Sequence, residues 1–486
     1  TALRAAQEDL DTLNAYDKMR AARRRLPAYK SRGELLQLLA AHRAVVVCGE
    51  TGCGKSTQVP QMLLEHAIAT GGGGATSILC TQPRRIAATS LARRVANERG
   101  EQVGARGSLV GYQVRLESKR SDTTRLLFCT TGIALRMMLC EPPLEGISHV
   151  VVDEVHERDT QTDLLLLLLR ELLPLRPNLR VICMSATVQA ETFSSYFGGC
   201  AVLTAKGRSY PVTEHHLEKL LEYTGFVLSA DSPCRVRSEA AWHKTSFAVH
   251  RGAVREEWQE EEKALNPDYD ESRYAACPEH VRGTLRHYYE HAINTDLIVE
   301  LLGYIDAEYG EGAVLVFLPG LANIQELLGT LHGSRVFGDA SRFCVLPLHS
   351  SLSPAEQQQV FETMPPGVRK VVLATNIAET SITIDDAVFV IDSGRAKQSM
   401  FDERKQMRRL VDVWISQAEA RQRAGRAGRV RAGHNFKLYT RHRHSNIMHA
   451  ARTPEMLRGP LQEVCLQLGL EPAPVPAPAP APAPAP

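Results

Sequence analysis

The octapeptide Gly49-Glu50-Thr51-Gly52-Cys53-Gly54-Lys55-Ser56 follows an apolar run at 44–47 and precedes a helix-like run at 57–66. Glycines between a strand and a helix let backbone N–H groups close around phosphate oxygens at the helix N-terminus. The lysine of such a loop reaches the β- and γ-phosphates of a nucleotide, and the serine hydroxyl can bind Mg²⁺. A plain Gly-rich turn is the alternative, but a chance match has odds of only about one in fifty. The predicted nucleotide ligands are Gly49, Thr51, Gly52, Gly54, Lys55, Ser56 and Thr57, with Ser56 also predicted to bind Mg²⁺.

Short apolar runs on both sides of this loop predict the fold class. Four of them have strand length and end in polar or Gly-bearing turns, at 44–47, 77–80, 150–152 and 181–184. Three more repeat the pattern later in the chain, at 313–317, 370–373 and 388–391. Continuous apolar runs of this kind are typical of parallel sheets covered on both faces. We therefore predict an α/β protein with two parallel-sheet domains in tandem.

An acidic pair, Asp153 and Glu154, ends the apolar run at 150–152 and is followed by Val155 and His156. Folds of this class bind ligands at the carboxyl ends of their strands, so both carboxylates are expected beside the phosphate loop. Because Mg²⁺ keeps several waters and takes only one or two carboxylates, Asp153 suits the metal and Glu154 suits the attacking water. Alone, such a pair is more often a surface turn.

Two further motifs supply hydroxyls and cations. Ser185-Ala186-Thr187 ends the next apolar run and can relay the state of a γ-phosphate, although helix capping is the alternative. Residues 422–429 read Gln-Arg-Ala-Gly-Arg-Ala-Gly-Arg, which places cations every three residues on one face of a helix or tight turn. An arginine that arrives from another domain can stabilise the charge of a phosphoryl-transfer transition state. A solvated basic helix is the alternative.

Composition limits the remaining possibilities. The 486 residues, 44% of them hydrophobic, suffice for about three domains, and the net charge of +2 does not itself indicate a polyanion partner. The eleven cysteines have neither zinc-site nor disulfide spacing, which indicates free thiols in the cytoplasm or nucleus, with an organelle matrix also open. The apolar run at 164–173 is well short of the roughly 20 residues that cross a bilayer, so we expect a core helix and no membrane partner.

The pattern changes in three places. Residues of about 213–290 are charged and aromatic and are predicted to be an insertion with some helix, whereas Pro-Ala repeats at 471–486 predict an extended, disordered tail. We place the boundaries as a helical extension at 1–33, an ATP-binding domain at 34–205, a second domain at 206–445 and a further segment at 446–470. Residue 1 is Thr, so targeting is not predicted.

Seven motifs in one order resemble those of DEAH-box RNA helicases of superfamily 2. They are the segments 49–57, 81–85, 153–156, 185–187, 315–320, 374–383 and 422–429. The third residue of the acidic motif is Val155, where the family pattern has Ala. The segment 365–370 and the long insertion look most like the subgroup related to RNA helicase A and the G-quadruplex-resolving helicases.

The resemblance implies two RecA-like domains that close on ATP and Mg²⁺. It places Glu154 and Gln422 at the reacting water and phosphate, and Arg426 and Arg429 as arginine fingers. It assigns coupling to His156, Ser185 and Thr187, and ribose contact to Asp385. Arg94 and Phe361 are similar to the pair that sandwiches the base. Because a stacked base shows no identity-reading hydrogen bonds, we expect other nucleoside triphosphates to be accepted too.

RNA is the partner that the resemblance implies. Its predicted contacts are Arg84, Arg85, Thr131, Gly132, Ser350 and Thr380. These groups suit phosphate and 2′-hydroxyl oxygens, so binding should be independent of sequence and weakened by salt. The implied function is RNA-stimulated NTP hydrolysis coupled to 3′-to-5′ translocation and unwinding, by a monomeric motor that works with accessory proteins.

One departure from the family leaves other functions open. Residues 460–468 resemble the first helix of a winged-helix domain, a truncated start that runs into the Pro-Ala repeats without the ratchet and OB-fold modules that complete the RNA channel. ATP hydrolysis is therefore a safer expectation than processive unwinding. The alternatives are an ATP-gated RNA-binding clamp without unwinding, a DNA-directed or protein-remodelling translocase, and, least favoured, an inactive scaffold.

Overall fold

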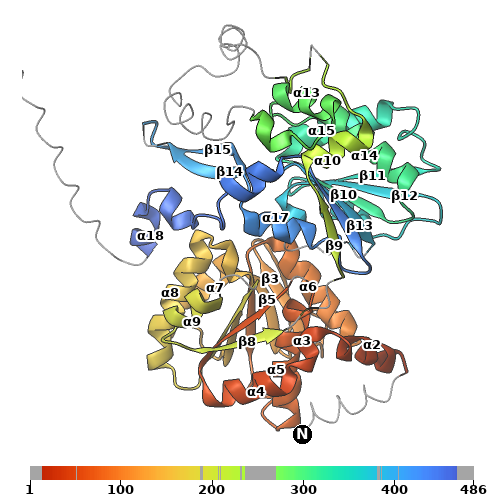
Figure 1. Cartoon of the computed structure of the whole chain (residues 1–486). Coiled ribbons are helices and arrows are strands. Elements are labelled where there is room, and N and C mark those ends of the chain that lie inside the picture. The colour runs from red at the N-terminus through yellow and green to blue at the C-terminus, as the bar shows by residue number, and fades with distance from the viewer. Residues whose placement is uncertain are drawn as a thin grey trace, which may run out of the picture.

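The computed structural model describes residues 14–50, 52–186, 190–205, 207, 210–229, 232–235, 270–379, 384, 386–402 and 404–467. They form two lobes, each built around its own sheet, with α17 (Gln417–Ala424) between them (Figure 1). The predicted Pro-Ala tail and the middle of the predicted insertion lie outside the described residues.

The first lobe contains a sheet of eight described strands in the order β4-β3-β5-β2-β6-β7-β1-β8. All neighbouring pairs are parallel except β3 with β4. β1, β2 and β6 are buried along nearly their whole length, as continuous apolar runs require. The strands are β1 (Ala44–Gly49), β2 (Ile78–Gln82), β3 (Val110–Val114), β4 (Glu117–Lys119), β5 (Leu126–Thr130), β6 (His149–Val152), β7 (Arg180–Ser185) and β8 (Ala201–Ala205).

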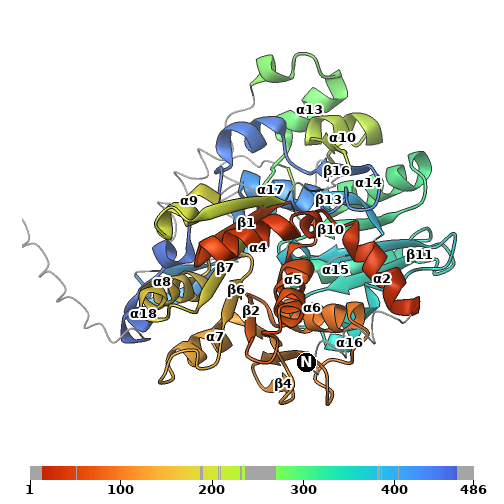
Figure 2. The same cartoon turned by 90° about the horizontal axis from the view of Figure 1, so that it is seen from below.

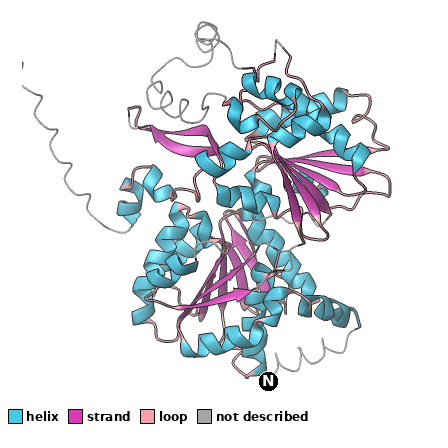
Figure 3. Ribbon diagram, viewed as in Figure 1, coloured by secondary structure: helices cyan, strands magenta, loops and turns pink. Residues whose placement is uncertain are grey.

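Helices cover both faces of this sheet (Figure 3). Leu35, Met62 and Val95 of α4, α5 and α6 pack on one face. Ile133 and Leu165 of α7 and α8 pack on the other. The helices are α2 (Asn14–Arg24), α3 (Pro27–Lys30), α4 (Arg32–Ala41), α5 (Lys55–Ala69), α6 (Arg85–Glu98), α7 (Thr131–Met138), α8 (Thr160–Leu175) and α9 (Ala190–Tyr196), with a 3₁₀ turn η1 (Val155–Glu157).

The second lobe contains a sheet of six described strands, all parallel, in the order β11-β12-β10-β13-β16-β9. Its strands are β9 (Val212–His215), β10 (Ala313–Phe317), β11 (Phe343–Leu348), β12 (Arg369–Ala374), β13 (Ala387–Asp392) and β16 (Gly433–Lys437). Its helices and 3₁₀ turns are α10 (Leu217–Thr224), η3 (Glu271–Tyr274), α13 (Glu279–His287), α14 (Thr295–Glu308), α15 (Leu321–Gly333), α16 (Pro354–Gln359), η4 (Asn376–Ala378) and α17. The predicted α/β fold with two tandem parallel-sheet domains is confirmed.

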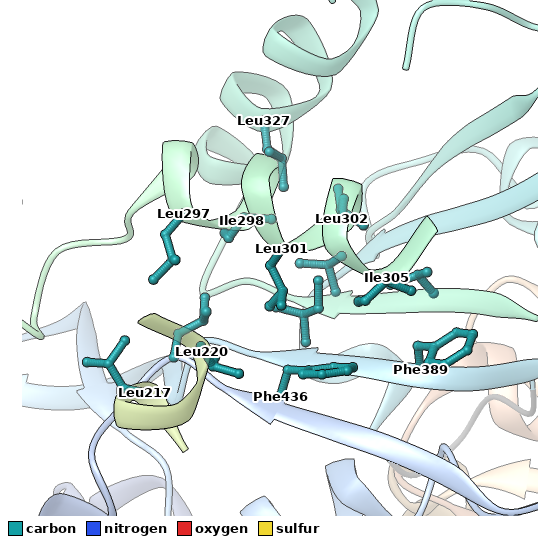
Figure 4. Close-up of a cluster of buried hydrophobic side chains, with 14 of the residues drawn as sticks. Leu217, Leu220, Leu297, Ile298, Leu301, Leu302, Ile305, Leu327, Phe389 and Phe436 are labelled. Carbon is teal, nitrogen blue, oxygen red and sulfur yellow. The ribbon is translucent and has the colours of Figure 1, made fainter. Parts of the chain in front are cut away.

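Both ends of the segment predicted as an insertion belong to the core of the second lobe. β9 is the edge strand beside β16, and Leu217 and Leu220 of α10 pack against Leu297 and Leu301 of α14 (Figure 4). At the other end, Val281 of α13 joins the same buried cluster. These elements are short, and the partners that bury them lie far away in the chain, so their membership of this core does not follow from their own sequence.

Three segments lie outside the two sheets. α2 and α3 pack against the first lobe beside α5 and α6 (Figure 2). β14 (Arg395–Asp402) and β15 (Met407–Trp414) form an antiparallel hairpin on the second lobe. The final described elements are the π-helical turn η5 (Arg443–Ile447), the 3₁₀ turn η6 (Glu455–Arg458) and α18 (Gln462–Gln467). Among the described helices, none combines the length and apolarity needed to cross a bilayer.

Candidate active site between the two domains

The phosphate loop connects β1 to α5 at the carboxyl edge of the first sheet. Gly52 and Gly54 have φ angles of +85° and +91°, a conformation that side-chain-bearing residues rarely adopt. The Lys55 ammonium donates to the carbonyl oxygens of Gly49 and Glu50, the latter at 3.0 Å. The Thr57 hydroxyl donates to the Gly54 carbonyl at 3.3 Å. Thr51 lies outside the described residues.

α3 supports this loop from the N-terminal side. The Ala28 N–H donates to the Cys53 carbonyl oxygen at 3.0 Å. A Cβ at Gly54 would lie 3.1 Å from a methyl carbon of Leu26, so the left-handed residue is also covered by an apolar side chain. The loop is therefore held in shape by the segment that precedes the first domain as well as by its own strand and helix.

Asp153 lies buried at the end of β6, next to the phosphate loop. Gln82, at the end of the neighbouring β2, donates to its carboxylate at 2.7 Å, and the Ser56 hydroxyl donates to it as well. Burial and the neighbouring Glu154 raise the pKa of Asp153 to about 6, against the opposing effects of Ser56, Gln82 and Lys55. Gln82 belongs to the motif at 81–85, but the sequence alone assigns no role to its side chain. The adjacency of β2 and β6 is what brings Gln82 to the carboxylate.

Glu154 follows in a left-handed conformation, with a φ angle of +55°. Burial and Glu157 raise the pKa of its carboxyl, while Lys55, Arg426 and Arg84 oppose the rise. One cation in that set, Arg426, comes from the second domain. Glu154 therefore lies where charges from both domains act on it.

His156 connects three parts of the site. The Ala186 N–H donates to its Nδ1 at 3.2 Å, and burial lowers the pKa of the ring, which favours the neutral form. The other ring nitrogen, Nε2, lies 2.7 Å from Gln422 Nε2 and 3.4 Å from a carboxylate oxygen of Glu154. Ser185, which precedes Ala186, donates its hydroxyl to the Ala186 carbonyl at 2.9 Å. Thr187 lies outside the described residues.

The second domain presents Gln422 and two arginines from the end of α17. A capping box of Ser416 and Glu419 begins this helix, and it ends at Ala424, so Arg426 and Arg429 lie in the turns that follow. Arg426 is buried and donates to the Glu379 carbonyl oxygen, and burial together with Arg429 lowers its pKa. Arg429 crosses to the first domain, since a Cβ at Gly52 would lie 3.8 Å from its Cγ and Nε.

Arg423 belongs to the same three-residue spacing as Arg426 and Arg429, but its side chain points into the second domain. Its guanidinium lies in the core of the second domain, where it pairs with Asp392 at 2.7 Å and with Glu379 at 3.2 Å. It also lies over the ring of Phe317. The spacing alone did not separate this buried ion-paired arginine from the two that face the first domain.

A cavity of about 600 Å³ opens between the domains beside His156 and Gln422. Its wall draws on both domains and combines apolar surface with several charged side chains. Other lining residues are Glu50, Arg84 and Glu157 from the first domain and Asn376, Glu379 and Glu419 from the second.

The predicted base-binding residues lie on separate domains. Arg94, on α6, is largely exposed, and its guanidinium pairs with the buried Glu98 at 2.8 Å. Phe361 follows α16 and is 42% exposed, which is unusual for a phenylalanine and leaves its ring open to a ligand. Asp385, the predicted ribose contact, lies outside the described residues, next to Asp386.

The predicted RNA contacts that the structure describes follow the carboxyl ends of β2 and β5 in the first domain and of β11 in the second. Arg84 donates to the Asn376 carbonyl of the second domain at 2.7 Å, a cross-domain contact that the sequence did not predict. Arg85 and Ser350 are exposed, whereas Thr131 is buried at the start of α7, with its hydroxyl 3.5 Å from the Gln82 carbonyl. Gly132 lies against Gln161, whose side-chain oxygen would be 3.2 Å from a Cβ there. Thr380 lies outside the described residues.

The arrangement of Ser56 and Asp153 fits a magnesium site. The hydroxyl and the carboxylate are in hydrogen-bond contact beside the phosphate loop, and both are oxygen ligands. The described residues contain no cluster of three or more His, Cys, Asp or Glu side chains that could hold a metal alone. Mg²⁺ needs no such cluster, since it usually combines one or two carboxylates with waters and nucleotide phosphates.

Two family models match the chain in tandem. The model described as DEAD/DEAH box helicase matches residues 32–195, and the model described as Helicase conserved C-terminal domain matches residues 294–431. They cover most strands of the two sheets that meet at the site, while β8, β9 and β16 lie outside the matched residues.

Curated relatives of the chain are named as helicases, in agreement with the two family models. The chain is 47% identical to the ATP-dependent RNA helicase DHX29 of Homo sapiens over 94% of its own length and 34% of the relative. It is 44% identical to the chloroplastic DExH-box ATP-dependent RNA helicase DExH4 of Arabidopsis thaliana, over 97% of the chain and 33% of the relative. It is 43% identical to the ATP-dependent DNA/RNA helicase DHX36 of Homo sapiens, over 93% and 44%. The chain thus spans a third to less than half of these relatives. With both helicase domains present in order, it belongs to the DEAD/DEAH-box helicase family, among the DExH-box members.

Proposed function

We propose that this chain is the ATP-hydrolysing motor of an RNA helicase. The observation that carries the proposal is the meeting of groups from both domains at one phosphate loop: the Arg429 side chain of the second domain lies over Gly52, and Gln422 contacts His156. A site completed by both domains links nucleotide state to domain closure. We take 34–205 and 206–445 as the two motor domains.

Hydrolysis is assigned to the residues around the γ-phosphate position. Lys55 exchanges its carbonyl partners for the β- and γ-phosphates when ATP binds. Glu154, whose pKa is raised, orients the attacking water and accepts its proton. Gln422, Arg426 and Arg429 stabilise the charge on the transferred phosphoryl group from the opposite side.

Ser56 and Asp153 would hold the magnesium ion. When bound, Mg²⁺ supplies charge neutralisation between the phosphates. Gln82 keeps the Asp153 carboxylate oriented toward that position. His156 transmits a change in the nucleotide site to Ser185 and Ala186 through the hydrogen bond that its Nδ1 accepts from the Ala186 N–H.

Arg94 and Phe361 are proposed to stack on the base from the two domains. This pocket would accept other nucleoside triphosphates besides ATP, because stacking does not read base identity. Asp385 is proposed to contact the ribose, and its neighbour Asp386 forms an ion pair with Lys370.

RNA is the proposed polymer. The relatives are named as RNA helicases, and the exposed Arg85 and Ser350 suit phosphate contacts. We propose 3′-to-5′ translocation and strand separation by a monomeric motor that works with accessory proteins. All eleven cysteines are free, which supports a cytoplasmic or nuclear site of action, or an organelle matrix.

The decisive experiment is steady-state ATP hydrolysis with and without single-stranded RNA or DNA, beside Glu154→Gln. Glu154→Gln keeps the size of the side chain but cannot accept a proton, so we expect a loss of at least about 100-fold in kcat with ATP binding retained. RNA-stimulated hydrolysis in the unchanged chain, lost in this variant, supports the motor. Equal stimulation by DNA favours a translocase that does not select RNA.

Strand separation is tested on partial duplexes with a 3′ or a 5′ overhang. Displacement of only the 3′-overhang duplex is expected. ATP-dependent RNA binding with no displaced strand would instead support a clamp.

A further inference from the structure

Lys370 is a buried cation with no role in the site described above. It lies on β12, is 3% exposed, and directs its ammonium toward three oxygen atoms. These are the carbonyl oxygens of Val360 at 3.0 Å and Glu362 at 2.8 Å, and a carboxylate oxygen of Asp386 at 2.9 Å. An ammonium has three N–H donors, so this set satisfies it completely.

The two carbonyls belong to the residues on either side of Phe361. Val360 is fully buried and anchors the turn in the core, while Phe361 projects outward. Lys370 thus holds the carbonyl groups of the residues before and after the exposed ring. Its third partner, Asp386, adjoins the proposed ribose-contact residue Asp385.

Arg94, the other proposed stacking residue, is held in a comparable way. The guanidinium of Arg94 is held by Glu98, a carboxylate 2% exposed that also accepts from Gln58 and Gln61 at 2.9 and 2.8 Å. Each proposed stacking side chain is therefore exposed and tied to a buried charged residue of its own domain. A buried charge costs free energy unless it is fully paired. The placement of Glu98 beside Arg94 and of Lys370 beside the Phe361 turn therefore requires an explanation.

We propose that Lys370 is a positioning residue for the nucleotide base: its ammonium sets the turn that presents Phe361 and the adjoining loop at Asp386. This inference rests on the proposed function of the site. Lys370 touches neither the base nor the phosphates. It acts through the orientation of Phe361, so its loss should affect base binding and leave the phosphate chemistry intact.

The test is Lys370→Met, which keeps the length and apolar stem of the side chain but removes its donors. Stacking is worth roughly 1–3 kcal/mol per base, so we expect the KM for ATP to rise about tenfold while kcat changes by less than about twofold. The fluorescence of 2-aminopurine riboside triphosphate, which stacking quenches, should be quenched less than with the unchanged chain. Inhibition by inorganic tripolyphosphate, which has no base, should be unchanged.

Lys437→Met is the matched control. Lys437 is also a fully buried lysine of the second domain, paired with Glu214 at 2.9 Å, but it lies on β16 away from Phe361. It should leave the KM for ATP and the quenching unchanged. Lys370→Arg, which retains donors, should restore most of the quenching. If Lys370→Met does not fold, Lys370→Gln, with two N–H donors, carries the same measurements.

The double variant Lys370→Met/Phe361→Ala tests whether Lys370 affects base binding through Phe361. If Lys370 acts through Phe361, the double variant should have the KM of Phe361→Ala alone. Fully additive effects, an unchanged KM in Lys370→Met, or equal loss of tripolyphosphate inhibition in both lysine variants would each overturn the inference. Absence of ATP binding by the unchanged chain would instead overturn the proposed function itself.

Discussion

Arg23 is a single buried charge that joins three helices of the first domain. Its guanidinium pairs with Glu65 at 2.7 Å, lies 3.7 Å from Glu98 and donates to Gln58 at 2.9 Å. Because Glu98 also holds Arg94, this arginine connects the N-terminal helices to the proposed base pocket.

Arg23→Met should destabilise the first domain by about 1–3 kcal/mol, because Glu65 and the buried Gln58 side-chain oxygen lose their donor while Glu98 keeps Arg94. Urea denaturation followed by circular dichroism measures the change. Arg24→Met is the matched control, since Arg24 is exposed on the same helix and should change stability by less than about 0.5 kcal/mol. Equal effects of the two substitutions would show that the network around Arg23 contributes nothing.

Residues of the site were predictable where the chemistry is encoded within one short segment. Lys55, Asp153, Glu154 and the arginine motif each carry their signal in adjacent residues and a neighbouring strand. Lys370 has no such signal, because its partners are main-chain carbonyls that only the folded turn brings together. A pairing with main-chain groups leaves no pattern in the residue types, because every residue carries a carbonyl group.

At the scale of elements, the edge of the second sheet is built from β9 and β16, whose aromatic side chains stack. His215 stacks on Phe436 and lies with its Nε2 3.1 Å from His434 Nδ1. Burial, assisted by His434, lowers the pKa of His215 to about 4. The neutral ring is therefore part of the packed edge.

His215 should make the second domain sensitive to acid. Its folded pKa of about 4 lies below the ordinary value of 6.5, so its contribution is complete above pH 6.5 and is lost as the pH falls toward 4. Between pH 7 and pH 5 the free energy of unfolding should fall by about 2 kcal/mol more in the unchanged chain than in His215→Phe, at 1.36 kcal/mol per pH unit. Denaturation at the two pH values measures this difference. An identical pH dependence in both proteins would contradict it.

Most interior strands were predicted from their apolar runs, and edge strands were missed. The runs at 44–47 and 313–317 lie in β1 and β10, which each pair with a neighbouring strand on both sides. β9, at one edge of the second sheet, reads Val-Thr-Glu-His and has no apolar run, whereas β11, at the other edge, is apolar along its length but mostly half-buried. A strand that is covered on both faces can be recognised from its continuous apolar run. An edge strand is placed by its pairing with a neighbouring strand, which its own sequence does not reveal.

At the scale of the molecule, the chain returns from the second domain to the first. Glu455 donates its N–H to the Arg158 carbonyl at 2.9 Å and accepts the N–H of Thr160 at 2.9 Å, at the start of α8. Met456 and Val464 pack against the core of the first domain. The two domains are therefore linked at three described places: this segment, the proposed active site and the Arg84–Asn376 contact.

Glu455→Ala should loosen α8 at its first turn, because the Thr160 N–H loses its acceptor at a cost of about 1 kcal/mol. Hydrogen exchange at 160–163 should become roughly fivefold faster, with protection in the second domain unchanged. Glu455→Gln, which keeps an oxygen acceptor, should show a smaller effect. Unchanged exchange in Glu455→Ala would mean that solvent replaces the carboxylate without cost.

The pairing of β9 with β16 also sets the order in which the two domains can fold during synthesis. The first sheet is complete once Ala205 has been made, whereas His434 must be present before it can pair with Thr213. During translation the first domain can therefore fold while the second waits, with β9 already outside the ribosome and its pairing edge uncovered. For more than two hundred residues of elongation, that strand waits without its partner in the sheet.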